Sequence, residues 1–137
     1  MLAQILIIIG ASIFGILGLI HLCFTFLTNR FESRDQAVTD AMKASSPILT
    51  SETTIWSAWV GFNASHSLGA LLVTAVFLPL SLFNFQMIEQ SLWFSILPAL
   101  IGLSYLTLAK LYWFKIPFIG ILIATVCFVI AALRLNI

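Results

Sequence analysis

Long apolar stretches alternate with short polar ones along the whole chain. In the first stretch, residues 2–27, the only strongly polar side chains are Gln4, Ser12, His21 and Thr25. At about 1.5 Å per helical residue, a run of this length exceeds the roughly 30 Å hydrocarbon core of a bilayer. The later stretches have the same character, and the pattern predicts four transmembrane helices in all, over residues 2–27, 55–83, 92–111 and 117–133.

Prolines and polar turns mark the limits of the later helices. The stretch 55–83 is longer than a perpendicular span needs, which predicts either tilt or a bend at Pro79. Residues 84–91 are predicted to form a short turn. Pro117 is expected at the first position of the last helix, where its fixed φ angle and missing N–H are tolerated.

Residues 28–54 make up the only extended polar segment. Its charged side chains are Arg30, Glu32, Arg34, Asp35, Asp40, Lys43 and Glu52. Residues 33–44 form either a short helix at the membrane surface or part of a solvated loop. A helix there would end at Ser45-Ser46-Pro47, because the residue before a proline disfavours helical backbone.

The distribution of Lys and Arg predicts how the chain crosses the membrane. With four spans, the segment 28–54 and the connection that holds Lys110 and Lys115 share one face, and Arg134 is the only cation on the other. Cytoplasmic loops carry an excess of Lys and Arg. We therefore expect both basic loops in the cytoplasm, and both termini and the 84–91 turn outside, in a multi-pass membrane protein.

Composition supports the membrane class and excludes others. The chain has 137 residues, of which 61% are hydrophobic and 8% charged, with a mean hydropathy of +1.13, whereas soluble proteins have about a quarter charged residues. Six Lys and Arg against five Asp and Glu leave no basic face for nucleic acid. Cys23 and Cys127 lie inside apolar stretches and are interpreted as packing residues. The expected fold is one all-α domain, an integral membrane four-helix bundle.

The most polar part of any predicted helix is the sequence between Trp59 and Gly69. Steps of three and four residues place His66 on one helix face with Trp59 and Asn63, and Ser67 lies one turn after Asn63. A polar group that faces lipid without a partner costs several kcal/mol, so this cluster should face other helices. It is interpreted either as a packing seam joined by hydrogen bonds or as a site for a ligand or catalysis.

His21 is predicted to meet this cluster. His21 lies about eight residues from the polar segment on the first helix and His66 about twelve on the second, so their depths differ by only about 6 Å. Paired histidines could hold a metal or a haem, or handle protons. No intramembrane carboxylate or third histidine completes a metal site, whereas a haem needs only two axial imidazoles.

Other chemistries have weaker support. Ser65 and Ser67 flank His66 in sequence, but neighbouring helical residues point in different directions, which disfavours a serine nucleophile. A general acid or base role for His66 lacks a carboxylate partner, and proton-coupled export lacks a carboxylate within a span. Tyr105 belongs to a polar patch on the third helix that either closes the far wall of the site or serves packing.

Two short motifs carry a resemblance to known proteins. They are Gly18-Leu19-Ile20-His21-Leu22 and Gly61-Phe62-Asn63-Ala64-Ser65-His66-Ser67-Leu68-Gly69. The chain resembles small, uncharacterised four-helix membrane proteins of bacteria and is similar to the DoxX-like group. The resemblance implies an inner-membrane bundle and brings no activity with it.

These observations lead to two hypotheses for the function. The favoured one is an accessory or structural protein that binds lipid, a hydrophobic small molecule, another membrane subunit or a second copy of itself. The candidate ligand-binding residues are His21, Trp59, Asn63, His66, Ser67 and Tyr105. The alternative is a small membrane enzyme or redox protein, of haem or quinone type, that uses His66 and His21.

Overall fold

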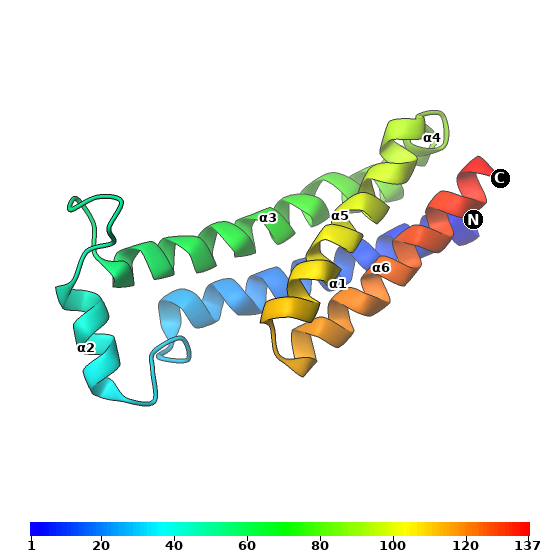
Figure 1. The fold of residues 1–137 in the computed structure, drawn as a ribbon. Coiled ribbons are helices and arrows are strands. Elements are labelled where there is room, and N and C mark those ends of the chain that lie inside the picture. Colours follow the sequence, from blue (N-terminus) through cyan, green and yellow to red (C-terminus); the bar gives the residue numbers. More distant parts are fainter. The chain divides into compact units, whose positions relative to one another are not determined.

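The computed structural model describes residues 1–137 and contains six helices and no strand. The helices are α1 (Leu2–Leu27), α2 (Gln36–Ala44), α3 (Ile55–Phe83), α4 (Phe85–Glu89), α5 (Leu92–Tyr112) and α6 (Lys115–Asn136). Four of them, α1, α3, α5 and α6, are long and apolar enough to cross a membrane. The protein is an all-α, multi-pass membrane protein, as the hydrophobic pattern predicts (Figure 1).

The limits of α1 and α3 agree with the prediction, whereas α5 ends one residue later than predicted, at Tyr112, and α6 covers Lys115–Asn136 instead of 117–133. The fourth span begins at Lys115, so Pro117 is its third residue and the prediction that it opens the helix was wrong. The first four N–H groups of any helix lack intrahelical acceptors, so a proline at the third position removes no hydrogen bond. The turn at 84–91 contains the short helix α4, and α3 continues through Pro79 without interruption.

The chain divides into two compact units, which are described separately. Unit 1 consists of residues 1–17 and 70–137, and unit 2 consists of residues 18–69. Four helices meet in unit 1 around one hydrophobic core, in which Phe14, Phe77 and Phe128 are the largest fully buried side chains. The ring centroids of Phe14 and Phe128 lie 5.8 Å apart. Unit 1 is therefore a four-helix bundle built from parts of α1 and α3 together with α5 and α6.

Small residues allow α1 to approach its neighbours closely in unit 1. A Cβ atom at Gly15 would lie 2.9 Å from the side chain of Thr74 on α3, and one at Gly10 would overlap the ring of Phe128 on α6. At the same place Thr74 Oγ1 donates a hydrogen bond of 2.6 Å to the carbonyl oxygen of Ala11. The predicted stripe of small residues on α1 is thus used for helix packing.

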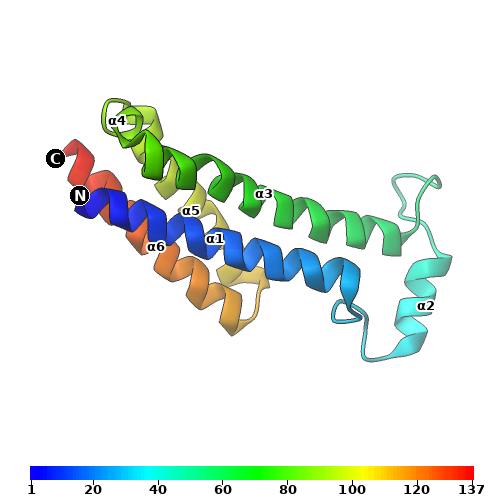
Figure 2. The ribbon, with the colours of Figure 1, turned by 180° about the vertical axis from the view of Figure 1, so that it is seen from behind.

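Polar side chains join the helices at one end of unit 1. Both termini and α4 lie at this end, and the α5–α6 connection lies at the other (Figures 1 and 2). Gln4 Nε2 donates to the carbonyl oxygen of Ser81 at 2.8 Å, and Asn136 Nδ2 donates to Ser95 Oγ at 2.9 Å. The Oγ atom of Ser81 is buried and has no hydrogen-bond partner.

Unit 2 contains the polar segment, which folds around α2. Asp35 caps this helix by accepting a hydrogen bond from the N–H of Ala37 at 3.0 Å, and Thr39 is fully buried. Of the two sequence interpretations, the short helix is correct over Gln36–Ala44. A salt bridge of 3.7 Å joins Lys43 to Glu32.

Candidate functional site

A hydrogen bond between α1 and α3 forms the centre of the candidate site in unit 2. His21 Nε2 lies 2.9 Å from Asn63 Oδ1. Asn63 Nδ2 donates to the carbonyl oxygen of Trp59 at 2.8 Å, which fixes the orientation of the amide and turns its oxygen towards His21. An amide oxygen only accepts hydrogen bonds, so His21 donates its Nε2–H. A neutral His21 then carries its lone pair on Nδ1.

His66 completes a pair of imidazoles beside this bond. The ring centroids of His21 and His66 are 5.4 Å apart, with the ring planes at 64°. Both side chains are partly exposed, whereas Asn63 is buried. The one-turn steps along α3 and the matched depths on the two helices, both read from the sequence, bring these three side chains together.

Phe31 also belongs to this cluster, although sequence reasoning missed it. Its ring centroid is 4.6 Å from that of His21 and 6.4 Å from that of Trp59. The indole Nε1–H of Trp59 donates to the carbonyl oxygen of Phe31 at 3.2 Å. The only signal in the sequence is an aromatic residue between Arg30 and Glu32 in an otherwise polar segment.

The two serines near His66 are engaged with their own helix. Ser67 is fully buried, and its Oγ donates to the carbonyl oxygen of Asn63 at 2.9 Å. Ser65 is exposed, and its Oγ donates to the carbonyl oxygen of Phe62 at 3.0 Å. A Cβ atom at Gly61 would meet nothing within 4 Å. Neither hydroxyl is arranged as a nucleophile. The small-residue stripe of Gly61 and Ser65 is not covered by a neighbouring helix.

Tyr105, the remaining predicted site residue, belongs to unit 1. Its ring centroid is 5.1 Å from that of Phe14 and 6.2 Å from that of Trp113. The neighbouring Ser104 and Thr107 are exposed and donate their hydroxyl hydrogens to carbonyl oxygens of α5. Within its own unit Tyr105 packs against the core, and its role in ligand binding stays a prediction.

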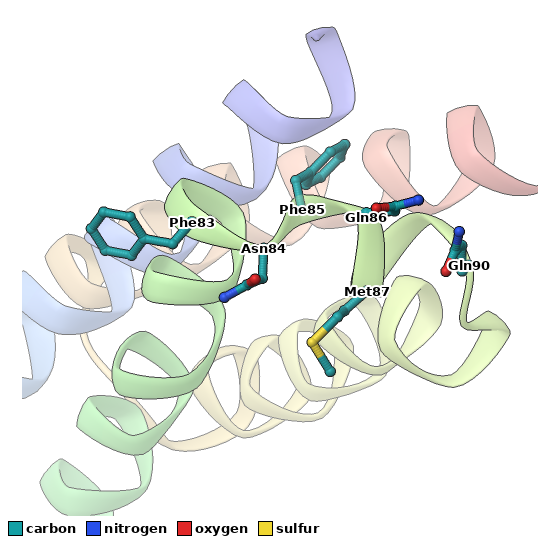
Figure 3. A pocket seen from close by; sticks show the side chains of 6 residues that line it. All are labelled: Phe83, Asn84, Phe85, Gln86, Met87 and Gln90. Carbon is teal, nitrogen blue, oxygen red and sulfur yellow. The ribbon is translucent and has the colours of Figure 1, made fainter.

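A hollow lies at the end of unit 1 where α3 turns into α4. It has a volume of about 230 Å³ and is lined by Phe83, Asn84, Phe85, Gln86, Met87 and Gln90. Figure 3 shows Gln86 and Gln90 close together at its outer edge, with the ring of Phe83 pointing away from them. None of the lining residues is an acid, a base or a cysteine, so proton transfer and metal binding have no support here.

The chemistry available in unit 2 is hydrogen bonding and aromatic stacking. The cluster offers two imidazoles, one carboxamide and the aromatic rings of Phe31 and Trp59. The structure holds no group of three or more His, Cys, Asp or Glu side chains that could bind a metal ion. The arrangement suits recognition of a polar group next to an apolar body.

Comparison with protein-family models, curated proteins and solved structures gives no match to this chain. The resemblance to small bacterial four-helix membrane proteins and to the DoxX-like group therefore stays a prediction. The functional argument rests on the geometry of the chain itself.

Proposed function

We propose that this protein is an accessory protein of a bacterial inner membrane. In this proposal it binds a membrane-soluble molecule through a hydrogen-bonding head group at His21, Asn63 and His66. The observation that carries the proposal is the contact between the partly exposed imidazoles of His21 and His66, whose ring centroids are 5.4 Å apart. Both residues lie in helices long and apolar enough to span a membrane. The basic segment 28–54 would lie on the cytoplasmic side, in accordance with its excess of Lys and Arg.

The burial of the polar side chains supports a ligand over a packing seam. Asn63 is 9% exposed and Ser67 is 0% exposed, and each forms a hydrogen bond within α3. The buried polar contacts that a helix-packing seam would need are therefore made by Asn63 and Ser67. His21 and His66 are partly exposed at the edge of the same contact, which leaves part of each ring accessible to an incoming molecule.

The aromatic neighbours define the kind of molecule that fits. The ring of Phe31 packs against His21, and the ring of Trp59 packs against Phe31. These rings supply flat apolar surface, while the imidazoles supply hydrogen-bond donors and acceptors. A lipid-soluble compound with a carbonyl or hydroxyl head group matches this combination. No carboxylate is needed on the protein, because the head group of such a compound is neutral.

Haem does not fit the same geometry. Two axial imidazoles bind the iron from opposite faces of the macrocycle. His21 and His66 instead touch edge to face, and His21 Nε2 is occupied by its bond to Asn63. Haem binding would require the rings to separate and this hydrogen bond to break.

The experiment is to identify the small molecules that the protein retains when it is purified from its native membrane. We expect one lipid-soluble compound to be retained by the wild type at near-stoichiometric amount and to be lost from His66→Gln, with thermal unfolding unchanged. Gln4→Leu is the matched control, since it removes a hydrogen bond between α1 and α3 in unit 1 and should retain the compound.

Two results would contradict the proposal. One is a wild-type protein that retains no specific compound while His66→Gln lowers the unfolding temperature sharply, which would make the cluster a packing seam. The other is a Soret absorption band in the purified protein that disappears in His66→Gln, which would establish the redox alternative.

A further inference from the structure

A groove on the outer surface of unit 1 lies between α5 and α6, near the connection that joins them. It has a volume of about 400 Å³, and the residues that line it are Leu103, Leu106, Thr107, Lys110, Leu111 and Phe118. This volume falls in the range of small-molecule sites, about 300–1,000 Å³. Thr107 donates its hydroxyl hydrogen to the carbonyl oxygen of Leu103 at 2.9 Å, which leaves the walls largely apolar.

The groove has a cationic end. Lys110 lines it, with Nζ 5.7 Å from the centroid of the Phe118 ring. Lys115, five residues further along the chain, is the first residue of α6 and is also exposed. Neither lysine forms a salt bridge, since the only one in the structure joins Lys43 to Glu32.

No acid of unit 1 can neutralise these lysines. Glu89 is the single Asp or Glu of this unit, and it precedes the start of α5 whereas Lys110 lies in the last turn. Their separation of 21 positions in the sequence corresponds to roughly 30 Å along a helix. The positive charge at the groove is therefore not neutralised by any Asp or Glu of the unit and is available to a negative group from outside it.

The groove follows α5 from the apolar part of the span towards its end. Leu103 and Lys110 are separated by seven residues, or about 10 Å along the axis. Tyr112 and Trp113 follow two and three residues after Lys110, and such aromatic residues favour the membrane interface. The leucines are thus at the depth of acyl chains and the ammonium group is at the depth of lipid phosphates.

We propose that this groove binds one anionic phospholipid. An acyl chain lies along the leucines, and the phosphate is held by Lys110. The occupant follows from charge complementarity, because Lys110, an ammonium group without a salt bridge, lies at the end of an apolar groove and matches the negatively charged head group of a lipid whose acyl chain follows the leucines. This site is independent of the proposed function at His21 and His66.

Native mass spectrometry of the full chain in detergent tests the proposal. The protein is titrated with phosphatidylglycerol and with phosphatidylcholine of the same acyl chains. We expect phosphatidylglycerol to bind at least fivefold more tightly, because each lysine near an anionic headgroup contributes a factor of about five. Lys110→Gln should weaken phosphatidylglycerol binding about fivefold and leave phosphatidylcholine binding unchanged.

Matched variants distinguish lipid binding at this groove from nonspecific effects of charge and apolar surface elsewhere on the protein. Arg134→Gln removes an exposed cation from the far end of α6 and should leave both affinities unchanged. Leu103→Asn should weaken both lipids, whereas Leu72→Asn, at an exposed leucine outside the groove, should weaken neither. Far-UV circular dichroism of each variant verifies folding.

Several outcomes would overturn the proposal. Equal affinities for the two lipids would remove the role of Lys110, and equal losses in Lys110→Gln and Arg134→Gln would show a nonspecific charge effect. Competition by millimolar inorganic phosphate together with no effect of Leu103→Asn would identify a free-anion site in place of a phospholipid site.

Discussion

Replacing His21 by phenylalanine and Asn63 by leucine, singly and together, measures the hydrogen bond at the centre of the candidate site. In the wild type the ring centroids of His21 and Phe31 are 4.6 Å apart. His21→Phe keeps an aromatic ring against Phe31 and removes the N–H group that donates a hydrogen bond to Asn63. Asn63→Leu also loses the bond to the Trp59 carbonyl. The double-mutant cycle cancels this second loss and isolates the bond between the two side chains.

The expected coupling energy follows from the membrane environment. Hydrogen bonds between helices in bilayers contribute about 0.6 kcal/mol on average and at most about 1.7 kcal/mol. The bond is 2.9 Å long, and the Trp59 carbonyl already orients the amide, so little side-chain freedom is lost when it forms. We therefore expect a coupling energy in the upper half of this range, about 1–1.7 kcal/mol.

Unfolding of the purified protein by SDS in mixed micelles, followed by circular dichroism, provides the four free energies of unfolding. A control cycle pairs His21→Phe with Asn136→Leu, whose side chain bonds Ser95 and Ala132 in unit 1. This control should be additive within about 0.5 kcal/mol. A coupling energy between His21 and Asn63 no larger than that of the control would refute the bond as a stabilising contact.

Three further predictions concern packing, an unpartnered hydroxyl and topology. Gly10→Ala should destabilise the protein by about 1–3 kcal/mol, because its methyl group would overlap the ring of Phe128, whereas Gly61→Ala, with nothing within 4 Å, should be neutral or slightly stabilising in the same SDS titration. Ser81→Ala should be neutral or stabilising in thermal unfolding, because the buried Oγ has no partner to lose. Ile48→Cys, fully exposed in the polar segment, should react with a membrane-impermeant maleimide only in inside-out vesicles, and reaction in intact cells would reverse the predicted orientation.

The four spans could be predicted from the sequence because each depends on length and hydropathy within a single segment. The limits of α1 and α3 agree with the prediction, since polar residues adjoin both ends of the first loop. The start of α6 was predicted two residues late. Pro117 is tolerated anywhere in the first turn, so its presence marks the neighbourhood of a helix start and not the residue itself.

The candidate site was only partly predictable, for a physical reason. His21, Asn63 and His66 lie on regular helices, where periodicity and depth determine which side chains can meet. Phe31 lies in an irregular segment whose path depends on tertiary contacts, among them the bond from the Trp59 indole to its carbonyl oxygen. No local pattern in the sequence encodes that contact.

The two imidazoles exceed what packing of α1 against α3 requires. In unit 1 the same two helices are joined closely by small residues and a hydroxyl of Thr74, without any titratable side chain. Phenylalanine at position 21 would still stack on Phe31 and would place no polar nitrogen in a membrane span, where an unsatisfied one costs several kcal/mol. One nitrogen of His21 is used by its hydrogen bond with Asn63, and the partial exposure of both rings supports the proposal that they also bind a polar head group. Under the proposed function we expect His21→Phe to keep most of the packing and to lose the bound molecule.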